Sequence, residues 1–279
     1  MLPLLSIIIA THSRPFLLER ALRSVHLQRS GNTQLLVCAD EGDPATKRVC
    51  AKYLSPQDVL LAVPSRKGPA ETRNAAMSQA SGKFLCFLDD DDTFEDGHLA
   101  AACAIASNGA DGFVFFNYRR VDELRLHLAF SAGSPYVEAA GRFELRCART
   151  IGINDWPLGG VRSAALMVRN YIPNNAFIVH ADVARRAAFD PHLPSHEDWD
   201  FLIAISKLIP FRHVDLYGPR VHVDANGRPS RNLVPLQDGS LPLDFLSIYR
   251  KWPAGDPATR SARHAVLRSM GLSVAADLL

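Results

Sequence analysis

The chain reads Phe84-Leu85-Cys86-Phe87-Leu88-Asp89-Asp90-Asp91-Asp92 at the end of its first third. Five consecutive apolar residues predict a strand that is buried on both faces, as in a parallel sheet covered by helices. Four carboxylates follow without a basic residue between them, and two like charges about 4 Å apart repel by roughly 4 kcal/mol near a protein surface. Oxygen ligands suit Mg²⁺ or Mn²⁺, ions that commonly also coordinate phosphate groups. The junction therefore predicts a metal and phosphate site at the carboxyl end of a central strand.

The acidic run has four other interpretations. A calcium-binding loop that starts at Asp89 needs Gly at the position of Phe94 and Glu at that of Ala100, and fails at both. An aspartate-rich prenyl-diphosphate motif belongs on a helix, whereas a strand leads into this one. The haloacid-dehalogenase phosphatase signature is matched literally by Asp89-x-Asp91-x-Thr93, although that family usually opens with the motif and strand–helix units precede it here. A solvated turn that caps the next helix is the fourth interpretation.

Composition and charge limit the class of protein. The 279 residues are 47% hydrophobic, enough for one large domain or two small ones that share a core. The net charge of +2 is not typical of nucleic-acid-binding proteins, so no nucleic-acid partner is expected. Met1–Ala10 is apolar but lacks a basic flank and is too short for a signal peptide or a membrane span. We therefore expect a soluble cytoplasmic protein.

The cysteines are odd in number and lack Cys-x-x-Cys spacing. Most of them fall on apolar segments, which predicts buried free thiols in a reducing compartment. These residues are Cys38, Cys50, Cys86, Cys103 and Cys147.

Strand and helix patterns alternate along the first hundred residues with short connections. Apolar runs predict strands at Leu4–Ala10, Gln34–Cys38, Val59–Val63 and Phe84–Leu88. Helical spacing of apolar residues predicts a helix at Phe16–Gln28. Further helices are predicted at Pro44–Tyr53, which starts with a proline in its first turn, and at Pro69–Ala80, which stops at a Ser-Gly pair. Such alternation implies a parallel sheet with helices on both faces and ligands beyond the carboxyl ends of the strands. Four loops then share one edge of the sheet: Thr11–Arg14, Asp40–Asp43, Pro64–Lys67 and Asp89–Asp92.

Beyond Asp92 the pattern is more irregular. Helices are predicted at Leu99–Ser107, Tyr136–Arg149, Trp199–Leu208 and Pro257–Met270. Strands are predicted at Gly112–Tyr118, Glu123–Phe130 and Ala176–His180. Gly, Pro and polar residues predict a loop at Thr150–Gly160 and a mobile loop at 223–242. The chain thus reads as one α/β domain whose first half is typical of nucleotide binding.

Six motifs follow one another along residues 4 to about 230. They are Ser6–Pro15, Asp40-Glu41-Gly42, Ala70–Ala76, Ser81-Gly82-Lys83 with the acidic run, Phe189-Asp190 and Glu197-Asp198-Trp199. In this order they resemble the family 2 glycosyltransferases of the GT-A fold. The resemblance implies a Rossmann-like α/β/α sandwich with a mostly parallel central sheet. It also implies a catalytic domain at 1–222, with a nucleotide-sugar half at 1–107 and an acceptor half at 108–222, followed by a loop and helical tail at 223–279.

By this resemblance the acidic run is an Asp-x-Asp element, which binds the metal, Mn²⁺ or Mg²⁺, and the diphosphate of a sugar nucleotide. Asp89 then binds the ribose or a metal-bound water, and Asp91 ligates the metal directly. Because the four acids are consecutive, Asp90 or Asp92 can take either place, and Asp90 is counted with the nucleotide-sugar ligands. Asp40 closes the second predicted strand and accepts a hydrogen bond from the nucleotide base.

Further ligands are expected around this edge. Thr11 and Arg14 end the first predicted strand, where backbone amides and a guanidinium meet the base and phosphates, with a plain helix cap as the alternative for Thr11. Lys67 and Arg73 are cations near the diphosphate, and the alternative for Arg73 is a solvated helix face. By resemblance, His222 completes the metal shell through an imidazole nitrogen, and its alternative is a surface histidine.

A second acidic cluster, Glu197-Asp198-Trp199-Asp200, opens an apolar predicted helix. Acids at a helix N-terminus are stabilised by the helix dipole, so simple capping is one interpretation. The resemblance instead implies that Asp198 removes the proton from the acceptor hydroxyl. Glu197 and Asp200 are then structural or orient the acceptor.

The resemblance therefore implies an inverting glycosyltransferase, with a UDP-sugar as the expected donor and a bacterial polysaccharide or lipid-linked glycan as the expected acceptor. Two alternatives stay open. One is a phosphatase with Asp89 as nucleophile and Asp91 as acid and base, and the other is a non-catalytic binder of sugar nucleotides. The intact Glu197-Asp198 pair argues against the binder, because binding alone needs no base there.

The predicted C-terminal helix gathers basic residues on or near one face. One interpretation is weak, mostly electrostatic contact with the inner face of the membrane. The other is a helix docked on the domain with its basic face in water. The residues concerned are Arg260, Arg263, His264 and Arg268.

Overall fold

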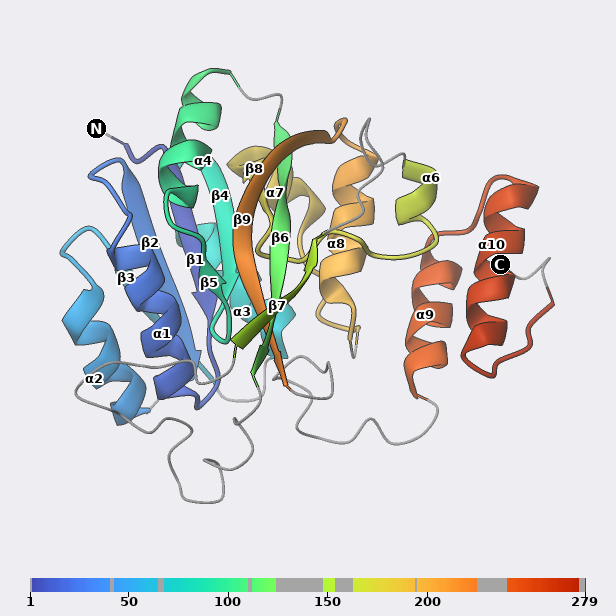
Figure 1. Cartoon of the computed structure of the whole chain (residues 1–279), viewed down its shortest axis with the longest axis horizontal. Coiled ribbons are helices and arrows are strands. Elements are labelled where there is room, and N and C mark those ends of the chain that lie inside the picture. The colour runs from blue at the N-terminus through green and yellow to red at the C-terminus, as the bar shows by residue number, and fades with distance from the viewer. Residues whose placement is uncertain are drawn as a thin grey trace.

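The computed structural model describes residues 2–40, 43–64, 68–109, 112–123, 148–153, 163–193, 195–224, 240–275 and 279. Their strands form one sheet in the order β3-β2-β1-β4-β8-β6-β9-β5, and β7 pairs with β6 beside that path. Helices cover both faces of the sheet (Figure 1). The predicted α/β/α sandwich is confirmed.

The strands β1 to β4 run parallel to one another. β1 lies between β2 and β4, and its last residue, Ala10, is opposite Cys38 of β2 and Asp89 of β4. The carboxyl ends of these strands therefore meet at one edge of the sheet, where the acidic run begins. The bounds are β1 (Leu5–Ala10), β2 (Thr33–Asp40), β3 (Val59–Val63) and β4 (Phe84–Asp89).

Each face of the sheet has its own set of helices, and in α1 the spacing of the apolar residues explains which side of the helix packs on the sheet. Leu18, Leu22 and Val25 of α1 are spaced for one helix face and pack with the β1 side chains Ile7 and Ile9. That face of the sheet is covered by α1 (Pro15–His26), α2 (Pro44–Tyr53) and α4 (His98–Ser107). The other face is covered by α3 (Gly68–Gln79), α7 (Ala181–Ala187) and α8 (Glu197–Ser206).

The second half of the sheet is mixed. β8 (Phe177–His180) runs antiparallel between β4 and β6 (Phe113–Glu123). Because β8 is antiparallel to β4, the start of β8 lies at the same edge as the end of β4. The remaining strands are β9 (Arg212–Asp224), which is parallel to β6, and the antiparallel β5 (Thr93–Phe94) and β7 (Ala148–Ile153).

Some sequence predictions for the second half are wrong in part. Ala148–Ile153 was expected to be a helix end and a loop, but it forms β7 because it pairs with β6. The loop predicted at 223–242 begins inside β9 and ends inside α9 (Ser240–Lys251). The remainder of these segments, and the predicted strand beyond Glu123, lies outside the described residues.

Several elements are not predicted by local patterns at all, including β5, α6 (Ser163–Leu166), α7, α9 and most of β9. β9 contains Gly218 and Pro219, which are disfavoured inside strands, yet Pro219 lies opposite Phe94 of β5. α9 carries Pro242 in its first turn, where the missing N–H has no helical partner to lose. These elements depend on their neighbours in space.

The C-terminal helices α9 and α10 (Pro257–Ser269) pack onto the core around α8. Arg263 of α10 is fully buried and donates hydrogen bonds to the backbone carbonyls of Met167, Tyr249 and Leu279. Its guanidinium also lies 4.4 Å from the centroid of the Tyr249 ring. The prediction that Arg263 belongs to a basic face is therefore wrong, and α10 is docked on the domain. Among the described helices, none is long and apolar enough to cross a membrane.

The thiols follow the sequence prediction where they are described. Cys38, Cys50 and Cys86 are buried and free, and Cys103 is free and half-buried. Burial raises the pKa of Cys38 and of Cys50 to about 11, so both are protonated at neutral pH. Cys147 lies outside the described residues.

Candidate active site

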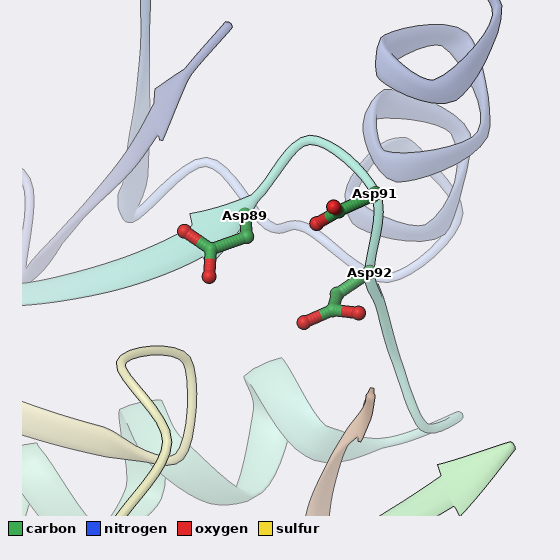
Figure 2. A group of neighbouring side chains, drawn as sticks. All are labelled: Asp89, Asp91 and Asp92. Atoms are coloured by element: carbon green, nitrogen blue, oxygen red, sulfur yellow. The ribbon is translucent and has the colours of Figure 1, made fainter. Parts of the chain in front are cut away.

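Three carboxylates converge on the turn that follows β4. The ligand oxygens of Asp89, Asp91 and Asp92 all lie within 4.8 Å of one another. Figure 2 shows the three side chains around this turn, with the Asp91 carboxylate pointing toward Asp89. The backbone N–H of Asp92 donates to the carbonyl oxygen of Asp89 at 3.0 Å, which closes the turn. An all-oxygen set of this kind fits Mn²⁺ or Mg²⁺.

The environment of Asp92 supports that fit. Asp92 is buried, and its carboxylate accepts from the Asn175 side-chain amide at 2.6 Å and from the His222 backbone N–H at 2.8 Å. Burial, followed by the charges of Asp91 and Asp89, raises the pKa of Asp92 well above its ordinary value. A divalent cation would relieve this repulsion and return the carboxylate to its charged form.

The Asp90 side chain is not part of the group formed by Asp89, Asp91 and Asp92, and it bonds other residues. Its buried carboxylate accepts from the Thr11 hydroxyl at 2.6 Å and from the Arg14 guanidinium, whose Nε lies 3.1 Å away. Arg14 also donates to the Asp91 carboxylate at 3.1 Å, and Arg20 donates to the Asp91 carbonyl oxygen. The cap alternative for Thr11 is wrong, because the N-cap residue of α1 is Arg14. Nucleotide binding by Thr11, Arg14 and Asp90 stays a prediction.

Arg73 joins the two acidic clusters. Its guanidinium donates to Asp89 at 2.8 Å and to Glu197 at 2.6 Å, and it lies 5.4 Å from the Phe189 ring centroid. The side chain is buried, so the solvated-face alternative is wrong. The adjacent Asn74 exchanges two hydrogen bonds with the Phe189 backbone. Binding of the diphosphate by Arg73 stays a prediction.

Asp198 lies in the first turn of α8, next to Glu197. Its half-buried carboxylate accepts from the Asn170 side-chain amide at 3.0 Å and from the Trp199 backbone N–H at 2.8 Å. Burial, with the charge of Glu197 second, raises the pKa of Asp198, which suits a group that must take up a proton. Asp200 serves a different purpose.

Asp200 is buried and ties α8 to the end of α9. It accepts from Lys251 at 2.9 Å and from the Trp252 indole at 2.7 Å. Of the two roles predicted for it, these contacts favour the structural one.

His222 is buried, so the surface-histidine alternative is wrong. Its Nε2 lies 2.9 Å from the Thr93 hydroxyl, and its backbone holds Asp92. Metal binding by its imidazole stays a prediction. Asp40 ends β2, but its side chain is outside the described part, and so is Lys67.

Sequence reasoning missed three polar partners of the acidic clusters. These are Arg20, Asn170 and Asn175, which contact Asp91, Asp198 and Asp92 respectively. Arg20 could have been noticed because it is a charged residue on the buried face of α1. Asn175 could have been noticed because two consecutive asparagines directly precede an apolar strand.

A family model described as "Glycosyl transferase family 2" matches residues 6–148. Over 111 residues the chain is 33% identical to the GalNAc(5)-diNAcBac-PP-undecaprenol β-1,3-glucosyltransferase of Campylobacter jejuni. That match covers 39% of this chain and 36% of the relative, so the chain spans little more than a third of the relative's length.

Two solved structures share the fold over nearly the whole chain. The crystal structure of S. aureus TarS 1-349 in complex with UDP-GlcNAc has a TM-score of 0.66 and 17% identity, and the match covers 96% of this chain and 73% of that one. The mannosyltransferase PcManGT from Pyrobaculum calidifontis, in complex with GDP-Man and Mn²⁺, has a TM-score of 0.59 and 12% identity, with 97% and 74% covered. At these identities the likeness shows the fold alone, and it confirms the predicted GT-A type.

Proposed function

Because the chain belongs to glycosyl transferase family 2, we propose that it moves a sugar from a nucleotide diphosphate sugar to an acceptor hydroxyl with inversion. One observation carries the proposal. The carboxylate group at the end of β4 and the acidic start of α8 are joined through Arg73, which binds Asp89 and Glu197. This contact supports the proposal because it brings the carboxylates that would hold the metal close to the helix start that carries Asp198. The family match overturns the phosphatase alternative, in which Asp89 was the nucleophile.

The donor end of the site is the group formed by Asp89, Asp91 and Asp92. These residues would hold Mn²⁺ or Mg²⁺, which would offset the charge that develops on the departing diphosphate. The PcManGT structure contains Mn²⁺, and the TarS structure contains UDP-GlcNAc. We take a UDP-sugar as the donor of this chain.

The acceptor end is Asp198. As the acceptor oxygen attacks the anomeric carbon, the Asp198 carboxylate takes the hydroxyl proton while the bond from that carbon to the diphosphate oxygen breaks. Asn170 and the Trp199 N–H keep the carboxylate in one orientation. Attack opposite the leaving group inverts the anomeric centre, and general base catalysis typically contributes about 10²–10⁴-fold.

The acceptor is a lipid-linked or growing bacterial glycan at the inner face of the membrane. The name of the C. jejuni relative specifies an undecaprenol-linked acceptor, which supports this choice. The reaction then takes place in the cytoplasm, where nucleotide sugars are the donors.

Thermal-shift titration tests the donor site. UDP, GDP and UDP-sugars are added with and without Mn²⁺, because a ligand that binds only the folded state raises Tm with concentration. We expect a Mn²⁺-dependent shift with UDP that Asp91→Ala abolishes. The control Asp96→Ala removes an exposed acid of the same region and should keep the shift. An Asp91→Ala variant with an unchanged Mn²⁺-dependent shift would contradict the metal assignment.

A further inference from the structure

Two consecutive buried asparagines carry polar atoms that find no partner among the residues that the structure describes. Asn174 is 4% exposed, and in the described part of the chain neither its Nδ2 nor its Oδ1 has a hydrogen-bond partner. Asn175 is 1% exposed and uses its Nδ2 on Asp92, but none of the described residues bonds its Oδ1. Buried amides are almost always paired, because an unpaired one loses its bonds to water without replacement. Asn117 shows the usual case, since it is 5% exposed and bonds both Asp215 and His213.

The segment that carries these asparagines lies between the two acidic clusters of the candidate site. β8 runs antiparallel to β4 with Ile178 opposite Cys86, so the residues before β8 lie at the end of β4. Asn175 touches Asp92 of the carboxylate group, whereas Asn170, at the other end of the same short segment, touches Asp198. The segment 170–175 therefore runs from the proposed base to the proposed metal site. An in-line displacement holds the transferred sugar between these two groups.

The unpaired atoms define the chemistry of a ligand. Asn174 offers one amide donor group and one acceptor, and Asn175 offers a second acceptor. The diphosphate of a sugar nucleotide carries only acceptor oxygens at neutral pH and would face two amide oxygens unfavourably. A sugar hydroxyl both donates and accepts, so adjacent hydroxyls can satisfy all three groups.

We propose that Asn174 and Asn175 form a hydroxyl-binding subsite for the sugar of the donor, an inference that rests on the proposed function. The two side chains recognise the transferred sugar by hydrogen bonds to its hydroxyl groups, and they do not bind the nucleotide. Asn175 also positions Asp92, so its substitution would disturb the metal group. Asn174 is therefore the residue to change.

The binding experiment compares UDP with UDP-glucose and UDP-GlcNAc, all in Mn²⁺, by calorimetry on the full chain. In Asn174→Leu we expect UDP affinity to stay within about twofold, while the affinity for the preferred UDP-sugar falls about tenfold, as expected for lost hydrogen bonds. Equal affinities of variant and wild type for both UDP-sugars would overturn the proposal. A wild-type chain that binds neither UDP nor a UDP-sugar would overturn the proposed function, and the subsite with it.

A second measurement separates ligand binding from a structural role. An apolar residue of similar size removes the unpaired amide, so the Tm of ligand-free Asn174→Leu should not fall. The matched control Asn117→Leu leaves Asp215 and His213 without their partner and should lower Tm. A drop in Asn174→Leu as large as in the control would show that Asn174 holds the fold, and would overturn the subsite.

Discussion

The four consecutive aspartates occupy four different environments. Asp89 is ion-paired with Arg73, and Asp90 is buried against Thr11 and Arg14. Asp91 and Asp92 complete the carboxylate group with Asp89, and burial raises the pKa of Asp92 well above its ordinary value. Because each carboxylate has its own partners, the four are not interchangeable. A scan of single Asp→Asn changes is thus a sharper probe than replacement of the whole run.

At the same scale, Asp198→Asn should keep donor binding and lose at least about 10²-fold in transfer rate, the low end for loss of a general base. The base works deprotonated, and burial and Glu197 raise its pKa, so transfer should fall as pH drops through a value above the ordinary 3.8. Because the pKa of Asp198 is raised in the folded state, its carboxyl group contributes to stability at acid pH, and this contribution is lost as pH rises through the folded-state pKa. At pH 7 the contribution is absent, so replacement by the neutral Asn should not lower Tm. Calorimetry, rate–pH profiles and melting curves check these three outcomes.

The matched control for that variant is Asp182→Asn, which makes the same change in the first turn of α7 at an exposed side chain. Its transfer rate and pH profile should equal those of the wild type. Wild-type turnover in Asp198→Asn would remove Asp198 from the mechanism.

Between elements, charge-assisted hydrogen bonds hold the candidate site together. α3 supplies Arg73, which bridges the end of β4 to the start of α8. α8 is tied in turn to the end of α9 through Asp200 and Lys251. The acidic ends of β4 and α8 would repel each other without the cation between them. The position of the proposed base relative to the proposed metal site therefore depends on α3.

Arg73→Met should destabilise the fold by about 3–5 kcal/mol, because it removes the buried guanidinium that is ion-paired with Glu197 and Asp89. Urea unfolding measures this loss. Adding Glu197→Gln removes the negative charge that faced Arg73. The double variant should therefore lose less stability than the two single variants lose together. An Arg73→Met chain as stable as the wild type would show that the bridge contributes nothing.

Across the whole molecule, one core links the sheet to the C-terminal helices. Phe245, Ile248 and Tyr249 of α9 and Leu267 of α10 belong to the same cluster as Trp199 of α8. In α10 the basic residues then divide. Arg263 is buried, whereas Arg268 is exposed and Arg260 and His264 are half-buried. Of the three arginines of α10, Arg260 and Arg268 are available to a membrane surface.

Vesicle sedimentation tests the membrane contact. We expect weak binding to anionic but not neutral vesicles at low salt, lost at high salt because the attraction is screened. Arg260→Gln with Arg268→Gln should abolish it, and Arg263→Met should instead lower Tm, since Arg263 bonds three backbone carbonyls. Absence of sedimentation at low salt would contradict peripheral binding.

The sequence by itself determined the fold up to β4 and the location of the candidate site. Every element predicted up to β4 has bounds within two residues of those found, because periodic apolar runs and helix spacing are local signals. The acidic run could be placed at a strand end for the same reason. Arg73 and the Glu197-Asp198 pair were also found from sequence, through the order of motifs.

Only the tertiary structure decided which groups meet. The Asn175–Asp92 and Arg73–Glu197 contacts join residues 83 and 124 positions apart, and no local pattern encodes such pairings. Gly218 and Pro219 are disfavoured inside a strand, and β9 continues through them because it pairs with β6 on both sides of these two residues. The sequence predicts Arg263 as a surface cation. In the structure it is buried, because its guanidinium donates hydrogen bonds to three backbone carbonyls. Periodicity reports which face of an element is apolar, whereas polar pairing in the interior depends on the packing of distant segments.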